Sequence, residues 1–261
     1  MTQAVEQVVL VEVRERVGWI RLNRPDRMNA VNGDLRRQLL AALKQVEKDD
    51  AVRCVVVIGS GRAFCAGADV GEFGTREGSL EAIRDEYHSI LTRLRSMPKP
   101  VIAAMNGVAA GIGASIAMAC DIRLAVPAAA FVEAFVKIGL TADGGATWLL
   151  PRLIGSGKAL EMFFTGDPLP AEEAERLGLV NRVVPAEELE ASAASLAGRL
   201  AAGPAGALAA IKRSVNRAQS VGFEEAIDFE FHLQAFLMAE PDFAEGVAAF
   251  LEKRAPRFGG A

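Results

Sequence analysis

Short apolar runs that alternate with amphipathic stretches constrain this chain most, because their order predicts how the strands pair. The runs at 54–58, 101–104 and 122–126 are almost continuously apolar, which is typical of strands covered on both faces. Between them, for example over 80–94, apolar residues recur at helical spacing. A strand, helix, strand order that repeats about every 45 residues predicts parallel pairing and an α/β core.

Further patterns frame this core at both ends of the chain. Residues 8–22 alternate in polarity around a charged turn and predict a β-hairpin. Asn32 is placed to cap the helix that follows the hairpin. After Pro151 the sequence becomes rich in Ala at helical spacing. We therefore expect helices over 171–177, 187–201, 204–218, 223–238 and 242–253.

Composition and charge exclude several classes of function. The 261 residues are 51% hydrophobic and 24% charged, as in an ordinary globular protein. The net charge is −4 and no Lys/Arg-rich run is present, so we expect no nucleic-acid partner. Three cysteines without a CxxC pair favour reduced thiols and a cytoplasmic location. Residues 1–6 lack a basic stretch followed by an apolar one, so we expect no signal peptide.

The uncharged stretch 101–120 resembles a membrane segment in length and carries the GxxxG pattern of Gly107 and Gly111. Pro100 precedes it, however, and Asn106 with Gly107 interrupts it. These breaks favour a strand, a loop and a buried helix. We therefore expect no membrane span.

Two glycine-rich loops, 59–69 and 106–113, are the first candidates for chemistry. Each follows an apolar run and precedes a predicted helix, where backbone N–H groups lack intrahelical acceptors and bind anions. Two such donors converging on one oxygen form an oxyanion hole. The same glycines would also allow close packing of a helix on a strand, and the loops by themselves leave both interpretations open.

Other catalytic constellations are poorly supported. The loop around Gly111 lacks the third glycine or alanine of a dinucleotide fingerprint, and no phosphate-binding GxxxxGK[ST] loop is present. The two histidines lie in helical patterns, so we expect no metal site. Cys65 is interpreted as a small buried thiol. Asp143 precedes two glycines and a predicted helix. Its side chain can be interpreted as an ordinary N-cap of that helix or as a functional carboxylate.

Several segments, taken in order, resemble the crotonase (enoyl-CoA hydratase/isomerase) superfamily: 23–30, 61–69, 99–107, 108–121, 165–167, 252–254 and the region of Asp143. The resemblance implies a spiral of ββα units over residues 1–200 and a helical C-terminal trimerisation region over residues 201–261. It implies assembly as a homotrimer or homohexamer. It also implies an acyl-CoA thioester substrate, with coenzyme A as part of the substrate and no separate cofactor.

The resemblance also implies positions for a binding site. The backbone N–H groups of Ala68 and Ile112 correspond to the oxyanion hole, although Ile112 replaces the usual glycine. Coenzyme A and substrate are expected along residues of the flanking loops: Arg27, Met28, Ala30, Ala66, Gly67, Asp69, Val70, Gly111 and Phe135. For Arg27, a contact with a coenzyme A phosphate and a solvated surface position are both open.

Departures from the family pattern bear on the reaction. The two glutamates with which hydratases activate water fall on Ser115 and Phe135, which cannot transfer protons as carboxylates do near neutral pH. Segments 107–114, 131–140 and 145–152 resemble those of 1,2-epoxyphenylacetyl-CoA isomerases, which act in phenylacetate breakdown.

Those isomerases, like some enoyl-CoA isomerases, place a lone catalytic aspartate where Asp143 stands. We therefore expect an isomerase in which Asp143 moves a proton next to the thioester. Phe131 and Phe135 are expected to make its surroundings apolar and to raise its pKa. Two alternatives remain open: a hydratase with a non-standard base such as Glu133, and a non-catalytic acyl-CoA-binding protein.

Overall fold

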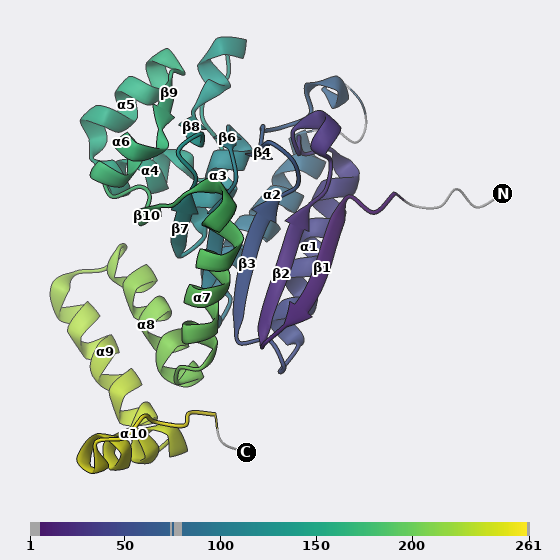
Figure 1. Ribbon diagram of the computed structural model, residues 1–261. Coiled ribbons are helices and arrows are strands. Elements are labelled where there is room, and N and C mark those ends of the chain that lie inside the picture. Colours follow the sequence, from purple (N-terminus) through teal and green to yellow (C-terminus); the bar gives the residue numbers. More distant parts are fainter. Residues whose placement is uncertain (1–5, 74, 76–79, 260–261) are drawn as a thin grey trace.

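A computed structural model describes residues 6–73, 75 and 80–259, so most of the N-terminal stretch on which the signal-peptide prediction rests lies outside the described residues. A six-stranded sheet in the order β1-β2-β3-β5-β7-β10 runs through the molecule (Figure 1). Its strands are β1 (Val9–Arg14), β2 (Val17–Leu22), β3 (Cys54–Gly59), β5 (Val101–Met105), β7 (Ile122–Ala125) and β10 (Arg182–Val183). β1 and β2 form the predicted antiparallel hairpin, and β3, β5 and β7 pair in parallel, as predicted. β2 and β10 also pair in parallel with their neighbours β3 and β7.

A second, four-stranded sheet carries the loops of interest. It consists of β4 (Ala63–Cys65), β6 (Val108–Ala110), β8 (Ala130–Val132) and β9 (Pro168–Pro170). β4, β6 and β8 are parallel neighbours, and β9 is antiparallel to β8. The sequence did not predict this sheet, because three-residue strands are too short to show a period. Since parallel neighbours end at the same edge, the segments after Cys65, Ala110 and Val132 emerge together.

Helices cover the large sheet on both faces: α1 (Gly33–Lys48) lies on one face and α7 (Leu189–Ala201) on the other (Figure 1). α1 begins as predicted, with the Asn32 side chain accepting a hydrogen bond from the Leu35 N–H at 3.0 Å. α2 (Leu80–Ser96) packs against α1 and against α3 (Ile112–Ala119). The helix predicted after the loop 106–113 is α3, which begins inside that loop, at Ile112.

The uncharged stretch 101–120 divides into β5, β6 and the buried α3. The strand and the buried helix are as predicted, whereas part of the expected loop forms the short strand β6. Among the described residues no single helix is long and apolar enough to cross a membrane. The segment 186–201, which contains α7, and α8 (Ala205–Ala218) would together be long and apolar enough, but they are bent by 105° at their junction.

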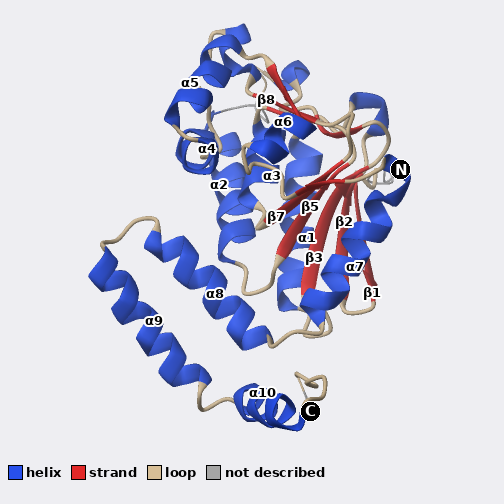
Figure 2. Ribbon diagram, turned by 60° about the vertical axis from the view of Figure 1, so that its left-hand side comes forward, coloured by secondary structure: helices blue, strands red, loops and turns tan. Residues whose placement is uncertain are grey.

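The C-terminal half is helical as expected, with short connections. Its further helices are α4 (Ala146–Ile154), α5 (Ser156–Thr165), α6 (Ala171–Arg176), α8 (Ala205–Ala218), α9 (Phe223–Leu237) and α10 (Pro241–Glu252). Helices α8 to α10 form an arm that extends from the body of the molecule (Figure 2). Large apolar side chains are exposed on this arm: Ile211, Val215, Phe223, Phe231, Phe236, Phe250 and Leu251. Its use in trimerisation stays a prediction.

Candidate active site

The two glycine-rich loops meet at the edge of the small sheet. Cys65 at the end of β4 pairs with Ala109 of β6. A Cβ added at Gly113 would lie 2.2 Å from the Cys65 carbonyl oxygen, so α3 starts in direct contact with the first loop. Gly67 has a φ of +101°, and a Cβ there would lie 3.0 Å from the Ala110 oxygen. Both glycines therefore allow the close approach of the loops, and Gly67 is also required for its backbone conformation.

Two backbone donors remain free where these loops meet. Ile112 is the first residue of α3, and Ala68 follows Gly67. Neither N–H has a hydrogen-bond acceptor in the described part of the chain. The preceding Gly111 N–H is bonded to the Val132 oxygen at 2.8 Å, and the Asp69 N–H to Val31 at 3.0 Å. Unpaired N–H groups flanked by paired ones are suited to bind one external oxygen.

Asp143 is held beside the start of α3. The Ser115 hydroxyl donates a hydrogen bond to the Asp143 carbonyl oxygen at 3.2 Å. Gly144 has a φ of +61°, and a Cβ there would lie 2.6 Å from Ile112 Cδ1 and 2.8 Å from Ser115 Oγ. The loop that carries Asp143 therefore packs directly on the helix that supplies one free N–H.

The Asp143 carboxylate does not cap the following helix. The N-cap of α4 is Gly145, with a φ of +76° and no side-chain cap hydrogen bond. Asp143 contributes only its main-chain oxygen, which accepts from the Ala146 N–H at 3.0 Å. The N-cap interpretation of Asp143 is therefore wrong, and its carboxylate is available for another use.

A cavity of about 670 Å³ opens beside Asp143, between α2 and α4. Tyr87, His88 and Leu91 line it from α2, and Trp148 lines it from α4. The Asp143 side chain is exposed toward it. Desolvation by the surrounding protein nevertheless raises the pKa of Asp143 above its ordinary value, in the direction expected.

The sequence did not single out Tyr87, His88 or Trp148 as site residues. On α2 the signal was confined to helical spacing, and Tyr87 fits that spacing as a core residue. Trp148 stacks with two guanidinium groups, at 4.9 Å from Arg95 and 4.1 Å from Arg152. Aromatic and basic side chains thus surround the open side of the cavity.

The segments expected to contact coenzyme A lie side by side. The Ala66 N–H donates to the Met28 oxygen at 3.0 Å. Arg24, which the sequence did not assign, donates through Nη1 to the Ala30 oxygen at 2.5 Å and to Asp69 Oδ2 at 3.0 Å. Arg24 therefore clamps the first expected segment to the second.

Of the other residues expected in this region, Arg27 is exposed at the end of η1 (Pro25–Arg27) and Val70 is exposed at the start of η2 (Val70–Glu72). Phe135 packs its ring against Gly111, 3.5 Å from the position of an added Cβ. Phe131 lies in the core at 1% exposure. Phe135 thus packs beside Gly111, the residue before the free Ile112 N–H, whereas Phe131 belongs to the core.

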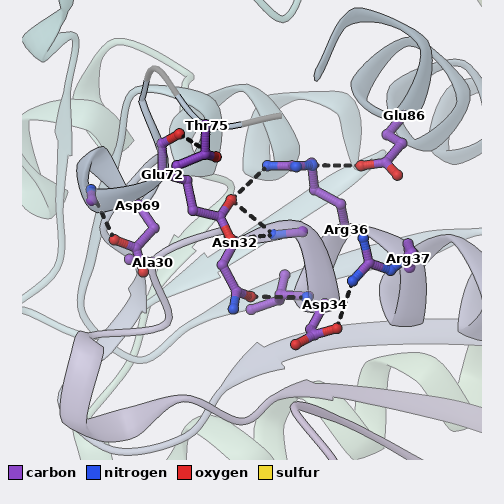
Figure 3. A network of polar contacts seen from close by, with 12 residues as sticks. Ala30, Asn32, Asp34, Arg36, Arg37, Asp69, Glu72, Thr75 and Glu86 are labelled. Atoms are coloured by element: carbon purple, nitrogen blue, oxygen red, sulfur yellow. Dashed lines mark hydrogen bonds and ion pairs between the residues drawn. The ribbon is translucent and has the colours of Figure 1, made fainter. Parts of the chain in front are cut away.

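A network of polar contacts fixes the segment after Asp69 (Figure 3). Both carboxylate oxygens of Glu72 accept from the Gly33 N–H at 3.0 Å. The buried Arg36, 2% exposed, pairs with Glu72 at 3.4 Å and with Glu86 at 2.5 Å. Since Glu86 precedes Tyr87 on α2, this network connects the glycine loop to the cavity wall.

The two positions that the resemblance assigns to the hydratase glutamates, Ser115 and Phe135, hold no carboxylate. Ser115 is fully buried and its hydroxyl is bonded to the Asp143 oxygen. Cys65 is a buried free thiol as predicted, and its Sγ contacts the Asn29 oxygen at 3.2 Å. Burial raises the pKa of the Cys65 thiol to about 12, which leaves it protonated and unreactive at neutral pH.

Glu133, which the sequence raised only as an alternative base, is the most unusual carboxyl group nearby. It follows β8 directly and is 1% exposed. Neither of its carboxylate oxygens has a hydrogen-bond partner among the described residues. Burial, and after it the charge of Asp143, raises the pKa of Glu133 to about 8. It therefore carries a proton at neutral pH.

Comparisons with known proteins identify the family of the chain. A family model for enoyl-CoA hydratase/isomerase matches residues 12–261. The chain is 40% identical to 1,2-epoxyphenylacetyl-CoA isomerase of Escherichia coli, covering 97% of this chain and 99% of the relative. It is 37% identical to crotonyl-CoA hydratase of Syntrophomonas wolfei, covering 98% of both. An enoyl-CoA hydratase structure from Geobacillus kaustophilus superposes with a TM-score of 0.91 at 39% identity, covering 97% of this chain and 98% of the other.

Proposed function

The chain belongs to the enoyl-CoA hydratase/isomerase family, and from this premise we propose that it is an acyl-CoA isomerase in which Asp143 moves a proton next to the thioester. The fold and the use of acyl-CoA thioesters follow from family membership. Its relatives include both an isomerase and a hydratase, so the proposal of isomerisation rests on the site residues of this chain.

In the proposed mechanism, the thioester oxygen accepts hydrogen bonds from the N–H groups of Ala68 and Ile112. Proton removal from the substrate carbon shifts negative charge onto that oxygen, which then meets fixed donors. By mutational precedent each donor of this kind lowers the barrier by about 3–4 kcal/mol. Asp143 takes the proton from one carbon and returns it to another, so the double bond moves without net addition. With an epoxide, the same group would assist ring opening and expansion.

The observation that carries this proposal is the placement of one carboxylate and the absence of two others. Asp143 is held against the start of α3 by Ser115 and Gly144, with its side chain free of capping. The positions where hydratases carry glutamates hold Ser115 and Phe135. A single carboxylate suffices for isomerisation because it can return the proton it takes, whereas hydration also requires a positioned water.

A second candidate function is hydration of enoyl-CoA with a non-standard base. It is favoured by the buried Glu133, whose raised pKa suits an acid–base group near neutral pH. The hydratase names of several relatives point the same way. The third candidate, a non-catalytic acyl-CoA-binding protein, has the fold without the reaction.

Coenzyme A is proposed to enter as part of the substrate, with no separate cofactor, along the segments 27–30 and 66–70 that Arg24 clamps together. The exposed Arg27 would pair with a phosphate of its nucleotide. The apolar arm of α8 to α10, residues 201–261 in the predicted division of the chain, would assemble a homotrimer or homohexamer. A cytoplasmic location and a role in phenylacetate breakdown belong to the same proposal.

The deciding experiment compares three thioesters: 3-enoyl-CoA, crotonyl-CoA and 1,2-epoxyphenylacetyl-CoA. We expect double-bond migration in the first or ring expansion of the third, with little water addition to the second. Turnover of crotonyl-CoA that exceeds isomerisation would support the hydratase instead. Tight binding of a thioester without hydrogen exchange at its α-carbon in deuterated water would support the non-catalytic protein.

A further inference from the structure

Glu133 occupies the same edge of the small sheet as the two free N–H groups. The parallel strands β4, β6 and β8 lie next to one another, so their carboxyl ends lead to the loop of Ala68, to Ile112 and to Glu133. The link is direct, because the Gly111 N–H bonds to Val132, the residue before Glu133, at 2.8 Å. The topology therefore places Glu133 next to the segment that carries the free Ile112 N–H.

A buried carboxyl group without partners is costly, and such groups call for a functional explanation. Glu133 is 1% exposed, and both of its oxygens lack partners within the described chain. Replacing such a group by an apolar side chain is often neutral or stabilising. The fold does not use the Glu133 side chain, so its presence must be explained by something other than packing.

Among the described residues, one charged group acts on Glu133. α3 carries no ionisable residue from Ile112 to Ala119. On the other sides, Lys137 of η3 (Ala134–Ile138) pairs with Asp167 at 3.9 Å, and Lys158 of α5 pairs with Glu161 at 3.3 Å. Among the described residues, the charge that acts on Glu133 is that of Asp143.

We propose that Glu133 is the proton partner of Asp143: the two carboxyl groups carry a single negative charge at neutral pH, with the charge on Asp143 and the proton on Glu133. Two neighbouring carboxyl groups that interact ionise in sequence, because the first charge opposes the second. This inference rests on the proposed role of Asp143 as base, and assigns Glu133 a positioning role through Asp143.

A neutral Glu133 matters because the reaction itself creates negative charge. The base removes a proton from carbon, and the enolate oxygen becomes negative while Asp143 becomes neutral. The proton count stays balanced, since Asp143 gains the proton that the substrate loses and later returns it. If Glu133 were ionised, the enolate would form beside an additional negative charge in a poorly solvated site. The rate should therefore fall when Glu133 loses its proton.

The test is the pH dependence of kcat in the wild type and in Glu133→Gln, which cannot ionise but has nearly the same shape. We expect the wild-type rate to fall on the alkaline side with a midpoint of about 8, and this fall to be lost in the variant. Glu161→Gln removes an exposed carboxylate from neighbouring α5 and should keep the wild-type profile. An unchanged alkaline fall in Glu133→Gln would overturn the proposal.

A second measurement does not depend on the variant folding. Infrared difference spectra of the wild-type protein should show a protonated carboxyl band at neutral pH that titrates away near pH 8. The absence of such a band would also overturn the proposal. Asp143→Asn separates the two hypotheses: if it retains turnover, the function proposed above fails, and if it loses turnover while Glu133→Gln keeps the alkaline fall, only the partnership fails.

Discussion

The Ser115 hydroxyl donates a hydrogen bond to the main-chain oxygen of Asp143 at 3.2 Å, which ties the loop of the proposed base to the helix that begins with Ile112. The resemblance to the family assigns a glutamate that acts on water to position 115. In this chain the Ser115 side chain at that position supports the backbone of Asp143.

Removal of this tether should impair turnover more than binding. Ser115→Ala loses one buried hydrogen bond, worth about 0.5–1.5 kcal/mol of stability. The Asp143 loop should then sample more positions, so kcat should fall while KM for the thioester changes little. Steady-state kinetics test this, with Ser220→Ala as the matched control because Ser220 bonds to Arg217 on the exposed arm. Equal losses in both variants would contradict the tether.

The proposed base can be removed without changing shape. Asp143→Asn should lower isomerase turnover by at least about 100-fold, the low end for loss of an acid–base group. Binding of the thioester, measured by calorimetry, should persist because the free N–H groups are unaffected. Asp167→Asn, which changes an exposed carboxylate, should be silent. Near-full turnover in Asp143→Asn would remove this residue from the mechanism.

The contact between the glycine loops should tolerate no side chain. Gly113→Ala places a Cβ 2.2 Å from the Cys65 oxygen, and overpacking of this kind costs about 1–3 kcal/mol or more. Gly198→Ala inside α7 meets no atom within 4 Å and should gain up to about 1 kcal/mol from helix propensity. Denaturant unfolding of both variants measures the difference. A stable Gly113→Ala would show that α3 can move away from the loop.

Arg27 should contribute to binding of the nucleotide part of the substrate. Arg27→Ala should raise KM for a coenzyme A thioester and leave KM unchanged for the corresponding pantetheine thioester, which lacks the nucleotide phosphates. The effect should shrink at high salt because an exposed ion pair is screened. Arg16→Ala, on the exposed β1–β2 turn, serves as the control. An identical rise for both thioesters would place the phosphates elsewhere.

Glu133 should make the stability of the protein depend on pH. Its pKa is about 8 in the folded protein and 4.5 as the ordinary value. Between these values the folded state holds a proton that the unfolded state has lost, so the free energy of unfolding falls as pH rises through this window. The loss of stability caused by Glu133 is absent at pH values below its ordinary pKa and complete at pH values above its pKa in the folded protein.

Glu133→Leu should therefore unfold at higher denaturant than the wild type at about pH 9, with a smaller difference at about pH 5. Glu161→Gln is again the control and should follow the wild type at both pH values. Parallel stability curves for the wild type and Glu133→Leu would show that Glu133 ionises normally in the folded protein.

Much of the fold could be predicted from sequence because its signals are local. The hairpin, the capping by Asn32 and the parallel core strands follow from alternation, cap chemistry and continuous apolar runs, and each is confirmed. The small sheet escaped prediction since its strands, such as β4 and β6, have three residues each. Short strands are specified by their neighbours in space and leave no period in the chain.

For the candidate site, too, only part could be predicted from the sequence. The sequence by itself determined which groups are available: two glycine loops, a carboxylate at Asp143, and no carboxylate at Ser115 or Phe135. The tertiary structure decided what these groups do, since it rejected Asp143 as a cap, joined it to Ser115, and buried Glu133 without a partner. Hydrogen-bond pairing, desolvation and coupling between charges depend on atoms that are distant in the chain. The sequence therefore determines which functional groups are present, and packing determines how they are paired and ionised.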